Sequence, residues 1–221
     1  MFRTALIAAL LSTSAAFAVP PEFSDGGVVL GLQYGPGNWF LDGPKLNAQL
    51  PVWEQSLLTN TTLSGHSATL RLGYNVLGHA TVEGSLTATG WNLFEPNRGG
   101  AGFATGGLHW HPLQLAKELW KPTWLEGRAF DASVFFGLGY GILGQVRGLD
   151  GLVWQWGFDA DWYFARTIGI GAFVRSTQLA TTNYYIDFYN RALAGNTVVL
   201  QDGGVGSFLQ FGVSLTLRIS P

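Results

Sequence analysis

The feature that most constrains this chain is an alternation of side-chain character with a period of two residues. Residues 153–164 read V-W-Q-W-G-F-D-A-D-W-Y-F, with bulky apolar residues at every second position. One face carries Trp154, Trp156, Phe158, Ala160, Trp162 and Phe164, and the other carries Gln155, Gly157, Asp159, Asp161 and Tyr163. A period of two is that of a β-strand, and acids interleaved with aromatics suit a strand between lipid and a polar lumen.

Seven further segments alternate in the same way, with varying regularity. They are residues 28–34, 67–76, 80–90, 102–111, 130–143, 168–178 and 209–219. Most of these segments are close to the ~9–11 residues that a tilted membrane-spanning strand needs. The sequence therefore predicts an all-β fold, a transmembrane antiparallel up-and-down β-barrel of eight strands. Ten strands are the alternative, if part of the first or last long link also forms a strand.

The composition favours the same architecture. Hydrophobic residues make up 47% of the chain and charged residues only 12%, against ~25% charged residues in ordinary soluble domains. Beyond the N-terminal segment, no stretch reaches the ~18 continuous apolar residues of a spanning helix. Because backbone polar groups in lipid must be paired within the protein, the remaining option is a closed barrel.

The N-terminal 18 residues are predicted to be a cleaved signal peptide. Arg3 supplies a positive charge, residues 5–11 form a short apolar core, and Ala16-Phe17-Ala18 fits the cleavage pattern. Residues 19–221 would then form the barrel, in the outer membrane of a bacterium. Without Arg3, 11 of the 12 basic residues remain against 14 acidic ones, so the charge balance does not suggest nucleic-acid binding. The chain has no cysteine, which excludes disulfides and a lipid-anchored N-terminus.

The links between the predicted strands are unequal in length. Residues 77–79 and 165–167 are short links, whereas 35–66, 92–101, 144–152 and 179–204 are long. Short periplasmic turns and long outer loops are typical of outer-membrane barrels. Residues 112–127 depart from this rule. Their apolar residues have roughly helical spacing, which predicts a short amphipathic helix at the periplasmic interface, with an irregular long turn as the alternative.

The last predicted strand carries the most specific motif. Residues 210–217 read Q-F-G-V-S-L-T-L, and Gln210, Gly212, Leu215 and Leu217 fit the signal that such barrels present to the outer-membrane assembly machinery. With this motif, the chain resembles the small eight-stranded bacterial outer-membrane barrel superfamily, which includes OmpA-like and OmpW-like barrels. The chain departs from the superfamily by ending in Ile219-Ser220-Pro221, where an aromatic residue is common. The resemblance implies a structural, adhesive or interaction role more often than catalysis.

Charged residues are predicted to gather on the inward face of the barrel. By alternation they are Arg71, Glu83, Asp131, Asp159, Asp161, Arg175 and Arg218. An eight-stranded barrel is just wide enough for its side chains to fill it, and an unpaired buried charge is costly, so these groups should pair. We expect Arg71 to pair with Glu83, and Asp159 or Asp161 with Arg175. A lumen blocked by salt bridges is the favoured interpretation, and a narrow ion path is the alternative.

Histidines give little support for catalysis or metal binding. His66 precedes Ser67 near the predicted outer side, but no recognisable lipid-enzyme motif surrounds the pair. His109 and His111 share one strand face, which is a weak metal signal, and a hydrogen-bonding pair at the periplasmic rim is favoured instead. We therefore predict no catalytic residues, no metal and no cofactor.

The predicted outer loops carry aromatic residues that the barrel does not require. Trp39, Phe40 and Trp53 lie in the first long link, and Tyr184 and Tyr185 lie in the last one. They predict either a contact surface or loops that pack on each other as a lid. The favoured function is structural or interactive, as an anchor within an envelope-spanning assembly. The alternatives are a narrow channel for small solutes and, last, a lipid-modifying enzyme. Expected partners are outer-membrane lipids, lipopolysaccharide, the assembly machinery and an envelope protein.

Overall fold

The protein is a closed antiparallel β-barrel in which eight long strands surround a filled interior. The computed structural model describes residues 26–51, 61–91, 99–123, 129–144, 147–193, 195–201, 203 and 206–219. The predicted signal peptide, residues 1–18, and Trp53 lie outside the described residues. The long strands are β1 (Val28–Leu41), β2 (Thr61–Leu77), β3 (Ala80–Trp91), β4 (Gly99–Trp110), β5 (Phe130–Gly144), β6 (Gly148–Ala165), β7 (Ile168–Tyr185) and β9 (Gly206–Ile219).

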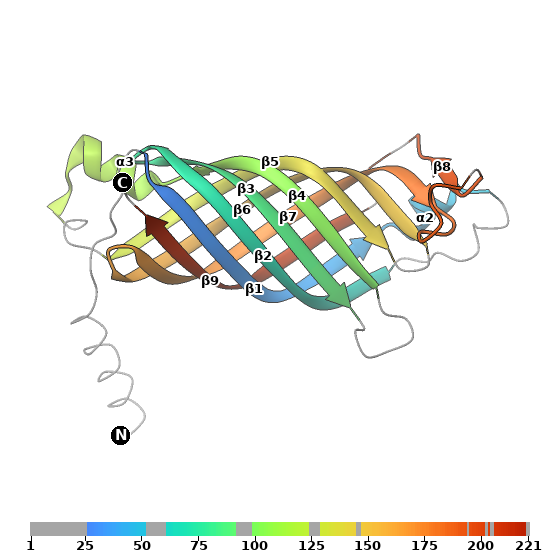
Figure 1. Ribbon diagram of the computed structural model, residues 1–221, viewed down its shortest axis with the longest axis horizontal. Coiled ribbons are helices and arrows are strands. Elements are labelled where there is room, and N and C mark those ends of the chain that lie inside the picture. The colour runs from blue at the N-terminus through green and yellow to red at the C-terminus, as the bar shows by residue number, and fades with distance from the viewer. Residues whose placement is uncertain are drawn as a thin grey trace, which may run out of the picture.

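Each long strand pairs antiparallel with its neighbour in the chain, and β1 closes the barrel by pairing with β9. The three short elements are α2 (Gly43–Asn47), α3 (Pro112–Trp120) and β8 (Thr197–Val199). The barrel has two distinct ends (Figure 1). We call the end with the 78–79 and 166–167 turns, α3 and the last residues of β9 the turn end, and the end with α2 and β8 the loop end.

The alternation in the sequence decides which side chains face outward, and this prediction is confirmed. Leu32 pairs with Leu70, which pairs with Leu86, and all three side chains are exposed on the outer wall. One residue further along, Gln33 pairs with Thr69, which pairs with Thr87, and these are buried inside. Large apolar residues exposed over a whole surface are expected only where the surroundings are lipid. In the described part of the chain, no helix has the length and apolar character required to cross a membrane.

The strands at the loop end are longer than predicted, so all four of the predicted long links are too long. β1 continues to Leu41 through Gly35-Pro36-Gly37, β6 begins at Gly148, and β7 continues to Tyr185. A Cβ atom on Gly35 would lie 2.0 Å from the carbonyl oxygen of Phe211 on β9. Glycine here permits close approach of two strands rather than a turn, which is why the Gly-Pro-Gly sequence was misleading.

The ten-stranded alternative is wrong, because the additional strand does not span the barrel. β8 has three residues and pairs with Asn183–Tyr185 at the loop end of β7. The helix predicted within residues 112–127 is present as α3, which has nine residues. It begins at Pro112 and ends where Lys121 adopts a left-handed conformation with φ of 44°. Proline at the start and a left-handed residue at the end are common helix boundaries.

Candidate functional site

The turn-end half of the interior holds a layer of paired charges. Five buried residues from five strands form it, and we call them the ionic layer: Arg71 of β2, Glu83 of β3, His109 of β4, Asp159 of β6 and Arg175 of β7. Arg71 bridges both acids, since its Nε lies 2.8 Å from Glu83 Oε2 and its Nη1 lies 3.1 Å from Asp159 Oδ2. The ionic layer therefore ties opposite walls of the barrel together.

Arg175 has fewer hydrogen-bonded nitrogen atoms than Arg71. Its Nη2 lies 3.5 Å from Asp159 Oδ2, and its guanidinium carbon lies 4.2 Å from the centre of the Phe135 ring. Its Nε and Nη1 have no acceptor among the described residues. A cation on an aromatic face is favourable, particularly away from water. Arg175 is thus held partly by Phe135 and partly by the shared carboxylate of Asp159.

Small residues beside Glu83 make room for these long side chains. Glu83 pairs in register with Gly73 on one side and Gly107 on the other. A Cβ atom on Gly107 would lie 2.7 Å from the Phe135 ring. An eight-stranded barrel has little spare interior space, so the inward glycines decide where an arginine and an aromatic ring can both fit.

A second polar group closes the turn end with help from α3. Asp131 of β5 receives His111 Nδ1 at 2.7 Å and Gln114 Nε2 at 3.1 Å. Arg218 of β9 donates from Nε to the hydroxyl of Tyr163 at 2.7 Å. Gln114 lies on α3, so this helix is attached to the barrel rim through the interior carboxylate.

Between the ionic layer and this rim lies a small polar cavity. Its volume is about 10 Å³, and its lining includes Arg71, His111, Asp161 and Arg218. That volume is at the lower limit for one water molecule. Asp161 does not pair with Arg175; its oxygens accept from Ser214 at 2.8 Å and Thr216 at 3.2 Å. At the rim, burial lowers the pKa of Lys117 on α3, and the nearby Asp131 carboxylate opposes that shift.

The loop-end half of the interior holds an apolar layer instead. Its centre is an aromatic stack in which the Trp39 ring stacks on Phe208 at 4.7 Å, centre to centre, and the tilted ring of Phe103 lies 5.3 Å from Trp39 and 6.1 Å from Phe208. We define the apolar layer as these three residues with their buried neighbours Leu143, Leu149, Val153, Leu179 and Tyr184. None of the eight is more than 6% exposed. The interior is therefore closed twice, by charges and by apolar packing.

The residues predicted as a loop contact surface do not lie together. Trp39 and Tyr184 are on strands, not in loops, and their side chains are buried inside at 1% exposure each. Phe40 is also on β1 but points outward, and Tyr185 is half-buried at the end of β7. The reason is the extension of β1 and β7 beyond the predicted strand ends, which places alternate residues inside the barrel.

A lid formed by two loops covers the apolar layer. Leu46 and Leu50, in and after α2, pack with Leu200 in the same apolar cluster. Lys45 Nζ donates to the carbonyl oxygen of Gly203 at 3.0 Å, and the backbone N–H of Gln201 donates to Gln49 Oε1 at 2.9 Å. The first and last long links are thus joined across the barrel mouth, as the lid interpretation predicts.

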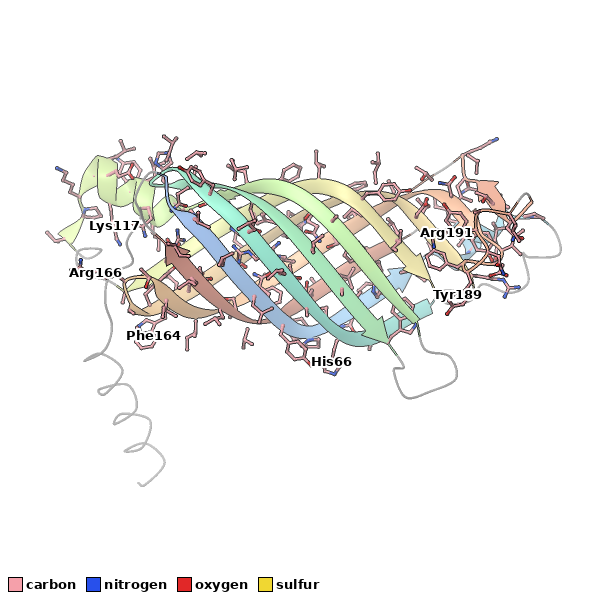
Figure 2. The ribbon with its side chains drawn as sticks, in the orientation of Figure 1. His66, Lys117, Phe164, Arg166, Tyr189 and Arg191 are labelled. Atoms are coloured by element: carbon pink, nitrogen blue, oxygen red, sulfur yellow. The ribbon has the colours of Figure 1, made fainter. Side chains whose placement is uncertain are left out.

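The residues that the sequence analysis weighed for catalysis, His66 and Ser67, have side chains on opposite faces of the barrel wall. His66 is exposed on the outer wall (Figure 2), where its ring stacks on Tyr34 at 5.8 Å. Ser67 points inward and donates to the carbonyl oxygen of Gly35 at 3.2 Å. Within the described residues, no group of three or more His, Cys, Asp or Glu is arranged to hold a metal ion.

The residues proposed as an assembly signal all lie on β9. Gln210 is buried inside, Leu215 is exposed outside, and Leu217 is half-buried. A Cβ atom on Gly212 would lie 2.1 Å from the carbonyl oxygen of Tyr34 on β1. Gly212 therefore has a role in closing the barrel seam, whatever its role in assembly.

Sequence reasoning missed two parts of the site. His109 was placed at the rim but lies in the ionic layer, where its Nε2 is 3.3 Å from Glu83 Oε1. The aromatic stack was not predicted, although Phe103 and Phe208 alternate with outward residues in their segments. Large apolar residues at inward positions near one end were the signal that could have revealed it.

Comparison with known proteins gives the fold and little more. No family model matches the chain, and no curated protein matches it. Among solved structures, Neisserial surface protein A (NspA) aligns with a TM-score of 0.54 and 8% identity over 88% of this chain and 99% of that one. Ail of Yersinia pestis and OprG of Pseudomonas aeruginosa each reach a TM-score of 0.47, at 11% and 12% identity, over 88% and 87% of this chain and 99% and 96% of theirs. The closed ring of eight antiparallel strands and the likeness to NspA give this chain the fold of the small bacterial outer-membrane β-barrels.

Proposed function

We propose that this chain is an integral outer-membrane barrel with a closed interior, and that it acts as a structural or interaction protein through its loop end. The observation that carries the proposal is the double closure of the interior by the ionic layer and the apolar layer. With the interior filled, the surfaces left for function are the two ends and the outer wall. The loop end would face outward from the cell, because the short turns and the end of β9 lie at the other end.

The loop end offers an apolar surface to a partner. Tyr189, Leu193 and Val199 are 80%, 61% and 73% exposed in and around the last long link. Figure 2 shows Tyr189 and Arg191 there, beyond the barrel wall. Exposed apolar side chains outside the membrane band favour contact with another protein. An envelope protein anchored at this position is the partner we favour.

Three measurements test the proposal directly. The purified barrel should change its gel mobility on heating, as closed barrels do. When cells are fractionated, the protein should be recovered with the outer membrane. In planar bilayers it should give no steady openings. Steady conductance would contradict the closed interior, and recovery only as a soluble periplasmic protein would contradict the barrel's location.

Photo-crosslinking tests the partner surface. A crosslinking residue at Leu193 should give a defined product with an envelope protein, and one at Arg166, on the turn end, should not give the same product. Equal products from both positions would remove the loop end as the interaction surface.

A narrow channel is the second candidate, and one observation favours it. Arg175 keeps two nitrogen atoms without an acceptor among the described residues, as a residue that binds a passing anion would. Replacing Arg175 with Ala would abolish openings if they occur and pass through the lumen. We propose no catalytic role, because the side chains of His66 and Ser67 lie on opposite faces of the wall. Replacing both residues should leave lipid A unchanged.

A further inference from the structure

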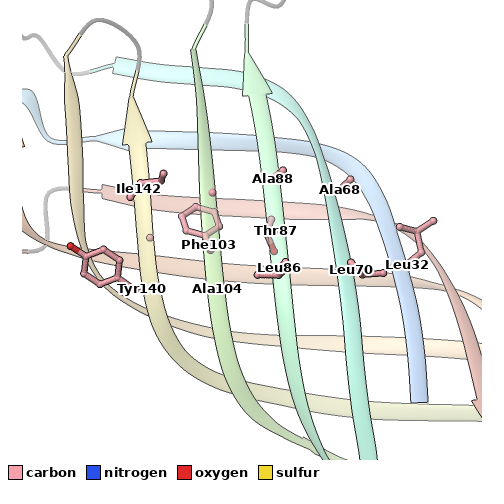
Figure 3. Close-up of a pocket in the computed structure, with 12 residues that line it drawn as sticks. Leu32, Ala68, Leu70, Leu86, Thr87, Ala88, Phe103, Ala104, Tyr140 and Ile142 are labelled. Atoms are coloured by element: carbon pink, nitrogen blue, oxygen red, sulfur yellow. The ribbon is translucent and has the colours of Figure 1, made fainter. Parts of the chain in front are cut away.

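The outer wall carries an apolar groove that the barrel itself does not explain. It has a volume of about 540 Å³ and crosses β1 to β5 on the loop-end side (Figure 3). Small residues form its floor, and larger apolar residues flank it. The floor is Ala68, Ala88, Gly102 and Ala104, and the flanks include Leu32, Leu70, Leu86, Tyr140 and Ile142. Such a volume lies within the ~300–1,000 Å³ typical of small-molecule sites.

A neighbouring carboxylate gives the level of the groove relative to the membrane. Ile142, at one end of the groove, pairs in register with Asp150. Asp150 is on the outward face of β6, opposite Ile142, where it is 7% exposed and its carboxylate accepts from the Tyr185 hydroxyl at 2.5 Å and from Asn183 Nδ2 at 2.8 Å. An acid in this position is costly in hydrocarbon but not at the headgroup boundary. The groove therefore lies just below the headgroups of the leaflet on the loop side.

Hydrocarbon is the only medium available at that depth. A groove left empty there would lose dispersion contacts along its whole lining. The lining is apolar and the floor is almost bare backbone, so the occupant must be a slender apolar chain. The acyl chain of a lipid in the same leaflet meets both requirements.

A cation lies close to the loop-end edge of this wall. Two residues beyond Ile142, Gly144 packs under the ring of Phe188, which also covers Gly148 on β6. The guanidinium of Arg191 is exposed and lies 5.0 Å from the centre of the Phe188 ring. An arginine held at headgroup level suits a phosphate group.

We propose that the groove binds one acyl chain of lipopolysaccharide and that Arg191 contacts a phosphate of the same molecule. This inference rests on the proposed outer-membrane location, since lipopolysaccharide occupies the outward leaflet that the loop end would face. It concerns the wall rather than the interior or the loop tips. It also gives a reason for the small residues Gly102 and Ala104 on β4, since a larger side chain at either position would fill the groove.

The test is the count of lipid molecules retained by the full-length barrel in detergent, measured by native mass spectrometry after addition of diphosphorylated lipid A. Gly102→Leu fills the groove. A Cβ atom at Gly102 meets nothing closer than 3.8 Å, so the substitution should not disturb folding. The matched control is Gly84→Leu, because Gly84 is an outward-facing glycine on β3 with nothing within 4 Å of its Cβ position and does not line the groove.

Gly102→Leu should lower the affinity for lipid A about tenfold, the effect of losing contact with roughly two methylene groups. Gly84→Leu should match the wild type. Arg191→Gln should weaken lipid A binding about threefold to tenfold and phosphatidylethanolamine binding less, because that lipid carries one phosphate, which its own amine partly neutralises. Equal retention by the wild type and Gly102→Leu, or equal affinity for lipid A and phosphatidylethanolamine, would overturn the proposal. Gel mobility and conductance measured on the same sample report separately on the closed barrel, so failure of the groove leaves that result standing.

Discussion

The two halves of the barrel interior are filled by different chemistry, although the same eight strands surround both. Near the turn end, two arginines and two acids share one buried network, and Arg71 contacts both carboxylates. Near the loop end, Trp39 stacks on Phe208 and packs against the tilted ring of Phe103, with no charged side chain in the cluster. Substitutions in the two layers should destabilise the barrel in different ways, because the ionic layer depends on paired charges and the apolar layer on packed volume.

The two layers differ in how strictly they constrain the positions of their side chains. A buried charge requires its partner at one place and in one orientation, so the ionic layer admits one arrangement of β2, β3 and β6. An apolar cluster tolerates changes of shape if its volume is kept. The ionic layer therefore fixes strand register, whereas the apolar layer seals the end over which the lid folds.

The largest effect should follow from removing one charge of the ionic layer. Arg71→Met leaves Glu83 without its 2.8 Å partner, and breaking a buried pair in this way costs about 3–5 kcal/mol. Urea unfolding of the refolded barrel, followed by gel mobility, would measure the loss. Arg191→Met, an exposed arginine outside the layer, is the control and should change stability by less than about 0.5 kcal/mol. Equal stability of the two variants would mean that water replaces the lost partner.

The apolar layer should lose slightly less from a single truncation. Leu179 is fully buried there, and Leu179→Ala should destabilise the barrel by about 3 kcal/mol through lost burial and a residual cavity. Leu179→Met keeps the volume and should cost less than about 1.5 kcal/mol. The same unfolding assay applies. If Met costs as much as Ala, the layer requires an exact fit, and the contrast with the ionic layer disappears.

The sequence predicted the strands that form the barrel wall but only part of the side-chain pairing in the interior. Alternation identified all eight strands and placed Arg71, Glu83 and Asp159 inside, because side-chain direction in a strand depends only on position. It could not give the pairing of Asp161, which depends on where Ser214 lies in a strand far along the chain. Strand ends were misjudged at Gly35 and Leu179, since a glycine that permits close strand approach looks the same in sequence as one that permits a turn.

The missed aromatic stack has the same origin. The first predicted strand ended at Tyr34, five residues before Trp39. Trp39 was therefore assigned to a loop, and the alternation that places it inside the barrel was not extended to it. His109 was correctly placed inside but at the wrong depth. Depth depends on strand tilt and on the stagger between neighbouring strands, and neither is visible in one segment alone.

Removing both charges of one pair should sharpen the contrast. In Arg71→Met with Glu83→Gln, Asp159 keeps Arg175 at 3.5 Å and Gln33 Nε2 at 2.8 Å. Net charge in the layer is preserved, so stability should return to within about 1 kcal/mol of the wild type. A double-mutant cycle with the single variants gives the coupling energy. If the double variant loses as much stability as the two single variants together, Arg71 and Glu83 are not energetically coupled.

The smallest effect should come from the lid, which lies outside both layers. Lys45 Nζ donates to the carbonyl oxygen of Gly203 at 3.0 Å in a partly buried position, and a single hydrogen bond of this kind contributes about 0.5–1.5 kcal/mol. Lys45→Met should therefore leave the unfolding midpoint of the barrel nearly unchanged. It should instead raise hydrogen exchange in α2 and around Gln201, where the two links meet. Because the lid covers the apolar layer without entering it, exchange at Val153 and Leu179 should stay at the wild-type level; faster exchange there would mean that the lid and the apolar layer form one cooperative unit.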